Sequence, residues 1–395
     1  MQIEFVKNIF MKEKEIVIVS AVRTPVGSFN GVLSQIPAPR LGAIVIREAL
    51  KRAKIDGKEV SEIMMGSVLT AGVGQAPARQ ASLFAGLPES VPCVTIGKVC
   101  GSGLKTVQLA MQSILSEDNL IVVAGGMENM SQTPHLLEKS RQGYRLGHSQ
   151  ISDSMIKDGL WDVYNQFHMG NAAELCVKEY KLTREEQDAY AIESYRRALL
   201  AQKEGYFKDE IVTTEKIEQD EEPQKFKPEK IPTLEPVFDK KGTVTAANAS
   251  KINDGAACVV LTTLKEAQKR RLKPLAKIIA YTEASQAPAW FTTAPIAAIK
   301  KVLEKANLKK EEIDLYEINE AFAAVALFAI RDLKLDPKKV NIHGGAVALG
   351  HPIGASGTRI LTTLLYALKR YQKKRGLASL CIGGGEANAM IVETL

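Results

Sequence analysis

The sequence has few cysteines among its 395 residues and no closely spaced pair of them. The five cysteines, at positions 93, 100, 176, 258 and 381, are odd in number and show no CxxC spacing. That pattern argues against both a disulfide framework and a zinc site. We therefore expect no metal site, and reduced thiols in a cytoplasmic protein.

Long apolar segments are also missing. The longest unbroken apolar run, residues 321–330, has ten residues, about half of the roughly 20 that a helix needs to span a bilayer. Residues 1–10 lack the apolar stretch of a signal peptide, and Met11 would serve equally well as a start. We expect no membrane partner and no targeting segment.

No strong excess of one charge is present either. The 52 Lys and Arg residues against 45 Asp and Glu leave a formal charge of +7 that is spread along the chain. This distribution argues against a nucleic-acid partner and suits a small anionic ligand, such as a phosphate-bearing cofactor. With 45% apolar and 25% charged residues, the composition is that of a globular protein, and the length suggests two or three domains.

What the chain does contain is an internal repeat at an offset of about 253 residues. Residues 49–55 match residues 302–308, and CGSGLKTV at 100–107 falls opposite GASGTRIL at 354–361. In each copy a helical pattern follows and then a buried strand that ends in glycines. Chance similarity between amphipathic helices is the alternative, but several features in one order favour a duplication.

The repeat predicts two α/β halves with an insertion between them. The first half covers residues 11–130 and is completed by about 253–273, and the second covers 274–395. Between them, Thr183 and Glu186 form a capping box before a long helix, and a charged irregular stretch follows. We interpret residues 131–252 as an inserted loop domain that covers a ligand cleft.

Cys100 stands directly before a predicted helix whose first residues are small. The free N–H groups and the dipole at a helix start stabilise an anion, so the pKa of such a thiol can fall well below its usual value of about 8.5. The alternative is a small buried core cysteine. His351 lies three residues before the position equivalent to Cys100 in the second copy, where an imidazole can activate the thiol. Its alternative is a structural histidine.

Two further positions follow buried strands. Cys381 begins CIGGGE, but no helix with GxGxxG spacing follows, so dinucleotide binding there is not expected. Asn319 ends one strand and precedes an apolar helix. It is suited to cap that helix, or to hold a catalytic water at the carboxyl edge of the sheet.

Seven stretches, taken together, resemble the thiolase family over essentially the whole chain from Ile16. They are VSAVRTPVGSFNG, GKVCGSGLK, AGGMENMS, GTVTAANAS, NEAFAA, GHPIGASG and CIGGG, in that order. The resemblance implies a five-layered αβαβα core, formed by two α/β halves, with a loop domain between them.

The resemblance also implies Claisen chemistry on coenzyme A thioesters. In it Cys100 is the acylated nucleophile, His351 activates that thiol, and Cys381 is the acid and base for the second substrate. One oxyanion hole would be formed by His351 with a water held by Asn319, and the other by the N–H groups of Cys100 and Gly383.

The loop at 164–170 resembles that of short-chain members, which interconvert two acetyl-CoA with acetoacetyl-CoA and CoA. The expected substrates are these thioesters, with no tightly bound cofactor, and the expected assembly is a dimer or tetramer with residues 72–84 near the subunit contact. A thiolase of broader chain length in fatty-acid degradation is the alternative. A condensing synthase, or a silent CoA-binding protein, is less expected.

Contacts to coenzyme A are assigned by the same resemblance. The expected contacts are His168, Met169, Ala247, Ser250, Lys225 and Lys227, although a solvated surface is the alternative for both lysines.

Four positions depart from the family pattern, namely His343, Ala247, Lys251 and Glu386. Lys251 would either help to bind anionic CoA or obstruct the pantetheine tunnel, and Glu386 would raise a thiol pKa if it points inward.

Overall fold

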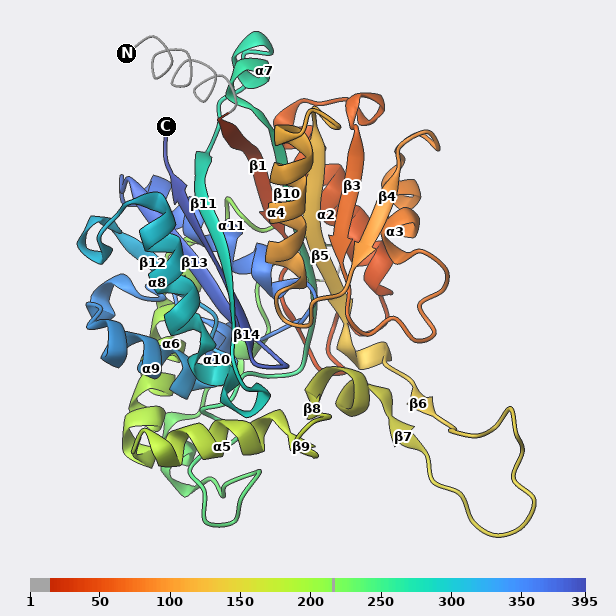
Figure 1. Ribbon diagram of the computed structural model, residues 1–395, viewed down its shortest axis with the longest axis vertical. Coiled ribbons are helices and arrows are strands. Elements are labelled where there is room, and N and C mark those ends of the chain that lie inside the picture. Colours follow the sequence, from red (N-terminus) through yellow and green to blue (C-terminus); the bar gives the residue numbers. More distant parts are fainter. Residues whose placement is uncertain (1–14, 215–216) are drawn as a thin grey trace.

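The computed structural model describes residues 15–214 and 217–395, so the predicted start of the first half at Met11 lies outside the described residues. The strands of the first half lie in the order β4-β3-β5-β10-β1. β3 is parallel to β4 and β5, and β10 is antiparallel to β1 and β5 (Figure 1). Their bounds are Ile16–Arg23 (β1), Glu62–Gly66 (β3), Cys93–Ile96 (β4), Val122–Asn129 (β5) and Asn253–Thr263 (β10), with the short β2 (Gly27–Ser28) paired to β10.

The strands of the second half lie in the order β12-β13-β14-β11. Their bounds are Ala276–Ser285 (β11), Leu315–Ile318 (β12), Arg375–Ile382 (β13) and Glu386–Glu393 (β14). β1 also pairs with β11 through Val17 opposite Lys277 and Ile18 opposite Ala276. The two sets of strands are therefore joined edge to edge by the short pairing of β1 with β11, which the repeat alone does not predict.

Helices cover and separate these strands in layers. α2 (Ala38–Ala53) and α3 (Pro77–Ala85) pack on the first half, and α8 (Ala294–Ala306) packs on the second, with α9 (Ala323–Leu333) beside it. Between the two sets of strands lie α4 (Ser102–Leu115) and α11 (Ser356–Arg370). Each strand set thus has an apolar core on both faces, and the predicted α/β fold with its five layers is confirmed.

The starts of α4 and α11 are in close contact. A Cβ added to Gly357 would lie 2.3 Å from Leu104 N, and one added to Gly103 would lie 2.8 Å from Thr358 Oγ1. Thr358 Oγ1 also donates to Gly103 O at 2.7 Å. The two glycines that the repeat aligns are therefore positions where the two halves approach each other closely, as only glycine permits.

The segment predicted as an insertion contains mostly short elements. The capping box of Thr183 and Glu186 at the start of its long helix is confirmed. The boundaries of the inserted segment, at residues 131 and 252, stay a prediction. The elements are β6 (His135–Leu136), β7 (Ser152–Asp153), a π-helix (Met155–Leu160), β8 (Trp161–Asp162), β9 (Phe167–His168), α5 (Met169–Glu179), α6 (Arg184–Lys203) and the 3-10 turns Glu222–Lys225 and Pro228–Thr233.

The loop between β6 and β7 projects from the rest of the chain as a long arm (Figure 1). Two short helices complete the fold, α7 (Leu264–Lys269) and α10 (Ala346–Leu349). No helix within the described ranges is both long enough and apolar enough to cross a membrane.

Candidate active site

A cavity of about 290 Å³ lies where the ends of both halves meet the inserted segment. Its walls are largely apolar, as in most small-molecule sites. Six of the residues proposed from the sequence line it: Cys100, His168, Met169, Ser250, His351 and Gly383.

Cys100 is held in a strained turn directly before α4. The preceding Val99 has a φ of +42°, a conformation that β-branched residues rarely adopt. Ser102 stabilises this turn, because its Oγ donates to Val99 O at 2.7 Å and accepts from Lys98 N at 2.8 Å. The predicted place at a helix start is confirmed.

The expected low pKa of the Cys100 thiol is wrong. Burial raises the pKa of this thiol to about 11, although the N–H groups of Gly383 and of Cys100 itself act in the opposite direction. Desolvation therefore outweighs the helix start, and the thiol is protonated at neutral pH. A base must take its proton when it reacts.

His351 is arranged as such a base. Its Nδ1 lies 2.6 Å from Ser356 Oγ, and that hydroxyl donates to Pro352 O at 2.9 Å. Since the hydroxyl proton is already used, Nδ1 carries the hydrogen and donates it to Ser356, which leaves the lone pair on Nε2. Nε2 has no hydrogen-bond partner in the part of the chain that the structure describes.

The imidazole is also kept neutral. Burial, with a smaller effect of Arg359, lowers the pKa of His351 to about 3. Its backbone is fixed by Asn253, whose Oδ1 accepts from His351 N at 2.9 Å. In the aligned repeat Ser356 falls opposite Ser102, and no local signal in the sequence reveals its contact with His351.

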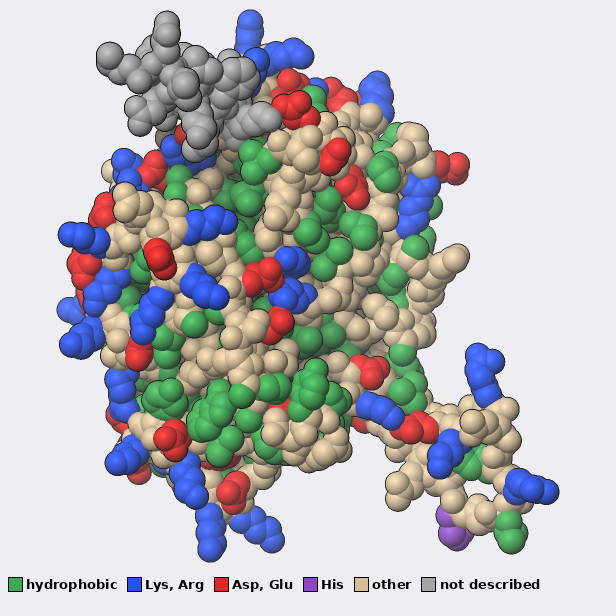
Figure 2. Space-filling view, in the orientation of Figure 1, with side chains coloured by type: hydrophobic (Ala, Val, Ile, Leu, Met, Phe, Trp, Pro, Cys, Tyr) green, Lys and Arg blue, Asp and Glu red, His purple; other side chains and the backbone are tan. Residues whose placement is uncertain are grey.

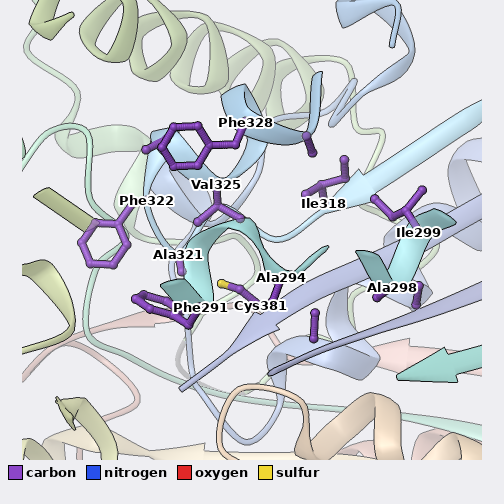
Figure 3. Packing of buried hydrophobic residues seen from close by; sticks show 14 of the residues in the cluster. Phe291, Ala294, Ala298, Ile299, Ile318, Ala321, Phe322, Val325, Phe328 and Cys381 are labelled. Carbon is purple, nitrogen blue, oxygen red and sulfur yellow. The ribbon is translucent and has the colours of Figure 1, made fainter. Parts of the chain in front are cut away.

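Cys381 lies at the end of β13 and is fully buried. In Figure 3 its sulfur lies among Phe291, Ala294 and Ala321. Burial, and after it the charge of Cys100, raise the pKa of the Cys381 thiol. The N–H of Gly383, two residues further on, lies within hydrogen-bonding reach of the Cys100 sulfur.

Asn319 does not cap a helix. α9 begins at Ala323 with Phe322 at its N-cap. Asn319 is 1% exposed, and within residues 15–214 and 217–395 neither its Nδ2 nor its Oδ1 has a hydrogen-bond partner. A buried amide left unpaired in this way costs stability, so a role in holding a water or a substrate oxygen fits it better than the cap.

The neighbouring Glu320 links α6 to the segment that precedes His351, a contact that the sequence does not reveal. Its carboxylate accepts hydrogen bonds from Tyr190 at 2.9 Å and Ser194 at 2.8 Å, both on α6. It also accepts from Asn341 Nδ2 at 2.9 Å and from Val347 N at 3.0 Å. Glu320 thereby fixes the segment with Asn319 against α6 and the turn that leads to His351.

Three side chains from the inserted segment and its end form one wall of the cavity. His168 caps α5, since its Nδ1 accepts from Gly170 N at 3.0 Å, and its ring stacks on Phe238 at 4.8 Å. Met169 Sδ lies 3.5 Å from the position of a Cβ on Gly383. Ser250 lines the cavity, and its backbone N donates to Ala321 O at 3.0 Å.

Three of the expected coenzyme A contacts do not line the cavity, namely Ala247, Lys225 and Lys227. Ala247 is buried. Lys225 Nζ donates to Ser28 Oγ at 2.5 Å and lies 3.6 Å from Glu222. For Lys225 the structure therefore shows local pairing rather than a position in the wall.

The departures from the family pattern have structural roles here. Lys251 lines the cavity, but its Nζ donates to Ala249 O at 2.8 Å and to Val347 O at 3.3 Å. Burial lowers the pKa of Lys251 to about 8. The ammonium is therefore folded back onto the protein, and its aliphatic stem forms part of the wall.

Glu386 does not act on either thiol. It forms an ion pair with Lys98 at the surface of the site, and neither thiol pKa has Glu386 among its causes. His343 is buried against Tyr206 and Phe207, and its Nε2 lies 3.2 Å from Tyr371 Oη. Both side chains thus have partners of their own.

Comparison with known proteins agrees with this geometry. Residues 16–265 match the family model "Thiolase, N-terminal domain", and residues 272–394 match "Thiolase, C-terminal domain". The acetyl-CoA acetyltransferase of Cupriavidus necator is 53% identical over 96% of this chain and 99% of its own. The mitochondrial enzyme of that name from Bos taurus is 50% identical over 96% and 92%.

A solved structure is similar over nearly the same length. The crystal structure of Acat5 thiolase from Ascaris suum in complex with coenzyme A superposes with a TM-score of 0.94. The two sequences are 47% identical, and the match covers 96% of this chain and 100% of that one.

Proposed function

This chain belongs to the thiolase family, and from that premise we propose that it is an acetyl-CoA C-acetyltransferase. It converts two acetyl-CoA into acetoacetyl-CoA and CoA, reversibly, by way of an acetyl group on Cys100. The observation that carries the proposal is the meeting of the Cys100 thiol, the unpaired Nε2 of His351 and the Gly383 N–H in one cavity. Relatives at about 50% identity that carry this enzyme name support it.

In the first half-reaction, the sulfur of Cys100 attacks the thioester carbonyl of acetyl-CoA. His351 Nε2 takes the thiol proton as the new C–S bond forms, because both groups are neutral before the attack. The N–H groups of Gly383 and Cys100 stabilise the oxyanion. The bond to CoA then breaks, and Cys381 gives its proton to the departing CoA thiolate.

In the second half-reaction, the Cys381 thiolate removes a proton from the methyl group of a second acetyl-CoA. The resulting carbanion attacks the acetyl group on Cys100 and releases that sulfur, which recovers its proton from His351. Asn319, through its unpaired amide, and His351 stabilise the enolate oxygen. The burial of Cys381 suits this role, since a desolvated thiolate is a stronger base.

A short acyl group suits the walls near the nucleophile. Met169 lies over Gly383, while Phe291 and Phe322 pack against each other at 6.3 Å on another wall. We therefore propose acetyl and acetoacetyl thioesters over longer chains. Thiolysis rates measured with 3-ketoacyl-CoAs of increasing length test this choice, and equal rates beyond four carbons would favour the thiolase of broader chain length.

We also propose that the protein is a cytoplasmic homo-oligomer. Support for assembly comes from the arm between β6 and β7, which carries basic residues (Figure 2) and exposes Leu146 completely. The projection of this arm from the rest of the chain supports the proposal, whereas a single exposed leucine is ordinary on a protein surface. The free state of the cysteines within the described residues fits a reducing compartment.

The central test is the intact mass after brief exposure to acetyl-CoA, together with thiolysis of acetoacetyl-CoA. One acetyl adduct on the wild type and on Cys381→Ser, none on Cys100→Ser, and rapid thiolysis by the wild type alone would establish both thiol roles. A wild type that acetyl-CoA does not acylate would overturn the short-chain proposal.

A further inference from the structure

A group of charged side chains connects the two loops that carry the reactive thiols. Lys98, two residues before Cys100, forms ion pairs with Glu386 and, at 3.2 Å, with Glu283. Lys105 also pairs with Glu283, at 2.8 Å. Figure 2 shows acidic and basic side chains side by side in this region, between α4 and β14.

The position of Glu386 makes this contact specific. Glu386 is the first residue of β14 and follows Cys381 by five positions and Gly383 by three. Lys98 begins the strained turn that contains Val99. The Ser102 hydroxyl accepts from Lys98 N and donates to Val99 O. The ion pair thus joins the nucleophile turn directly to the loop that supplies the acid and base.

Two buried contacts run parallel to the ion pair. Asn388 Nδ2 donates to Gly101 O at 3.3 Å and is fully buried. A Cβ on Gly101 would lie 2.4 Å from Ile382 Cδ1, so the turn rests directly on the end of β13. Any shift of the turn relative to this loop changes the separation of the two thiols.

The stability that these ion pairs provide is small. The side chains of Lys98, Glu283 and Glu386 are 23%, 30% and 36% exposed, and pairs of this kind contribute about 0–1 kcal/mol. The effect of these ion pairs on the placement of the two thiols can be much larger than their effect on stability. A misplacement of a reacting group by about 1 Å can lower the rate roughly a hundredfold.

We propose that Lys98, Glu386 and Glu283 are positioning residues that set the separation between Cys100 and the loop of Cys381 and Gly383. The proposal rests on the proposed function, because it concerns the step in which both thiols act. Here the three residues are called the inter-loop clamp. None of them touches the reacting atoms.

The test compares Glu386→Gln and Lys98→Met with Lys98→Arg, which keeps the charge. Glu393→Gln is the matched control, because Glu393 ends the same strand and pairs with Lys277 and Arg375 away from the thiols. We expect Glu386→Gln and Lys98→Met to lower kcat for acetoacetyl-CoA thiolysis about tenfold or more. KM and Tm should stay close to the wild-type values, and Lys98→Arg should recover most of kcat.

A double variant adds a second criterion. Lys98→Met with Glu386→Gln should be no slower than the slower single variant, because Lys98→Met already removes the ion pair that Glu386→Gln removes. Hydrogen exchange of residues 97–101 should rise in Glu386→Gln and not in Glu393→Gln, and this readout does not depend on catalysis.

The outcomes separate the two proposals. A wild type that is neither acetylated nor active refutes the proposed function, while unchanged exchange in Glu386→Gln refutes the clamp. In an active wild type, the clamp is refuted if both single variants keep kcat within about twofold, or if Glu393→Gln loses as much as Glu386→Gln.

Discussion

Replacement of Ser356 by Ala should slow the acylation of Cys100 without unfolding the protein. The hydroxyl lies 2.6 Å from His351 Nδ1 and is fully buried. Without it, the hydrogen on Nδ1 has no acceptor, and the imidazole is free to rotate or to place its hydrogen on Nε2. Either change removes the lone pair that takes the thiol proton.

The size of the effect follows from the charge that develops on the ring. A hydrogen bond to a charged group contributes about 1.5–3 kcal/mol, and His351 becomes an imidazolium only as the thiol is deprotonated. The loss therefore falls on the transition state and should slow acylation by roughly 10- to 150-fold. KM for acetyl-CoA should change little, since Ser356 lies behind the imidazole.

The assay is rapid-quench mass spectrometry of acetylated Cys100 in a single turnover. Thr362→Val is the matched control, because Thr362 is a buried residue on the same helix and, among the described residues, its hydroxyl bonds only to Thr358 O. An acylation rate for Ser356→Ala within about twofold of the wild type would refute the assignment of the tautomer. An equal loss in Thr362→Val would show that the effect is a general disturbance of α11.

Three further predictions concern single side chains. Asn319→Leu should keep or raise Tm, because a buried unpaired amide is removed. The same variant should lower kcat for steady-state thiolysis by about 10²–10³-fold. A kcat close to the wild-type value would argue against the oxyanion role of Asn319. Burial lowers the pKa of His343 to about 4. As the pH falls below 6.5, His343 therefore takes up a proton in the unfolded chain before it does so in the folded protein. The contribution of His343 to the free energy of unfolding should accordingly fall by up to about 3 kcal/mol between pH 6.5 and 4. In urea titrations across this range, His343→Asn should show a correspondingly smaller loss, and an identical loss would contradict the assignment. Lys251→Met should leave the Kd for CoA within about twofold by calorimetry, since the ammonium bonds to Ala249 O and Val347 O; a tenfold weaker Kd would restore a role in phosphate binding.

The features that depend on local sequence were predictable. Cys100 before a helix, the capping box of Thr183 and the alignment of Gly103 with Gly357 follow from helical periodicity and small residues, and the structure confirms them. The thiol pKa was not predictable. Burial of Cys100 depends on side chains from the distant segments that close the cavity, and a local argument from the helix start considers only the opposing effect.

Contacts between distant residues were also missed. Glu320 accepts from side chains more than a hundred residues earlier in the chain, and β1 joins β11 through only two residue pairs. Neither leaves a periodic signal. Asn319 illustrates the same limit, since a cap and an unpaired catalytic amide have the same residue type and differ only in where the helix begins.

The division of the site between the two halves explains why the central helices are packed so closely. Cys100 comes from the first half, whereas His351, Cys381 and Gly383 come from the second, so the proton transfer between Cys100 and His351 crosses the boundary between them. The contact of Gly103 and Gly357 leaves no room for a side chain, and Thr358 adds a hydrogen bond across it. Because both reactive groups are neutral at rest, their charges must form together as the substrate is attacked. That requirement favours a rigid boundary over a flexible one, since electrostatic stabilisation at a transition state depends on groups that are already in place.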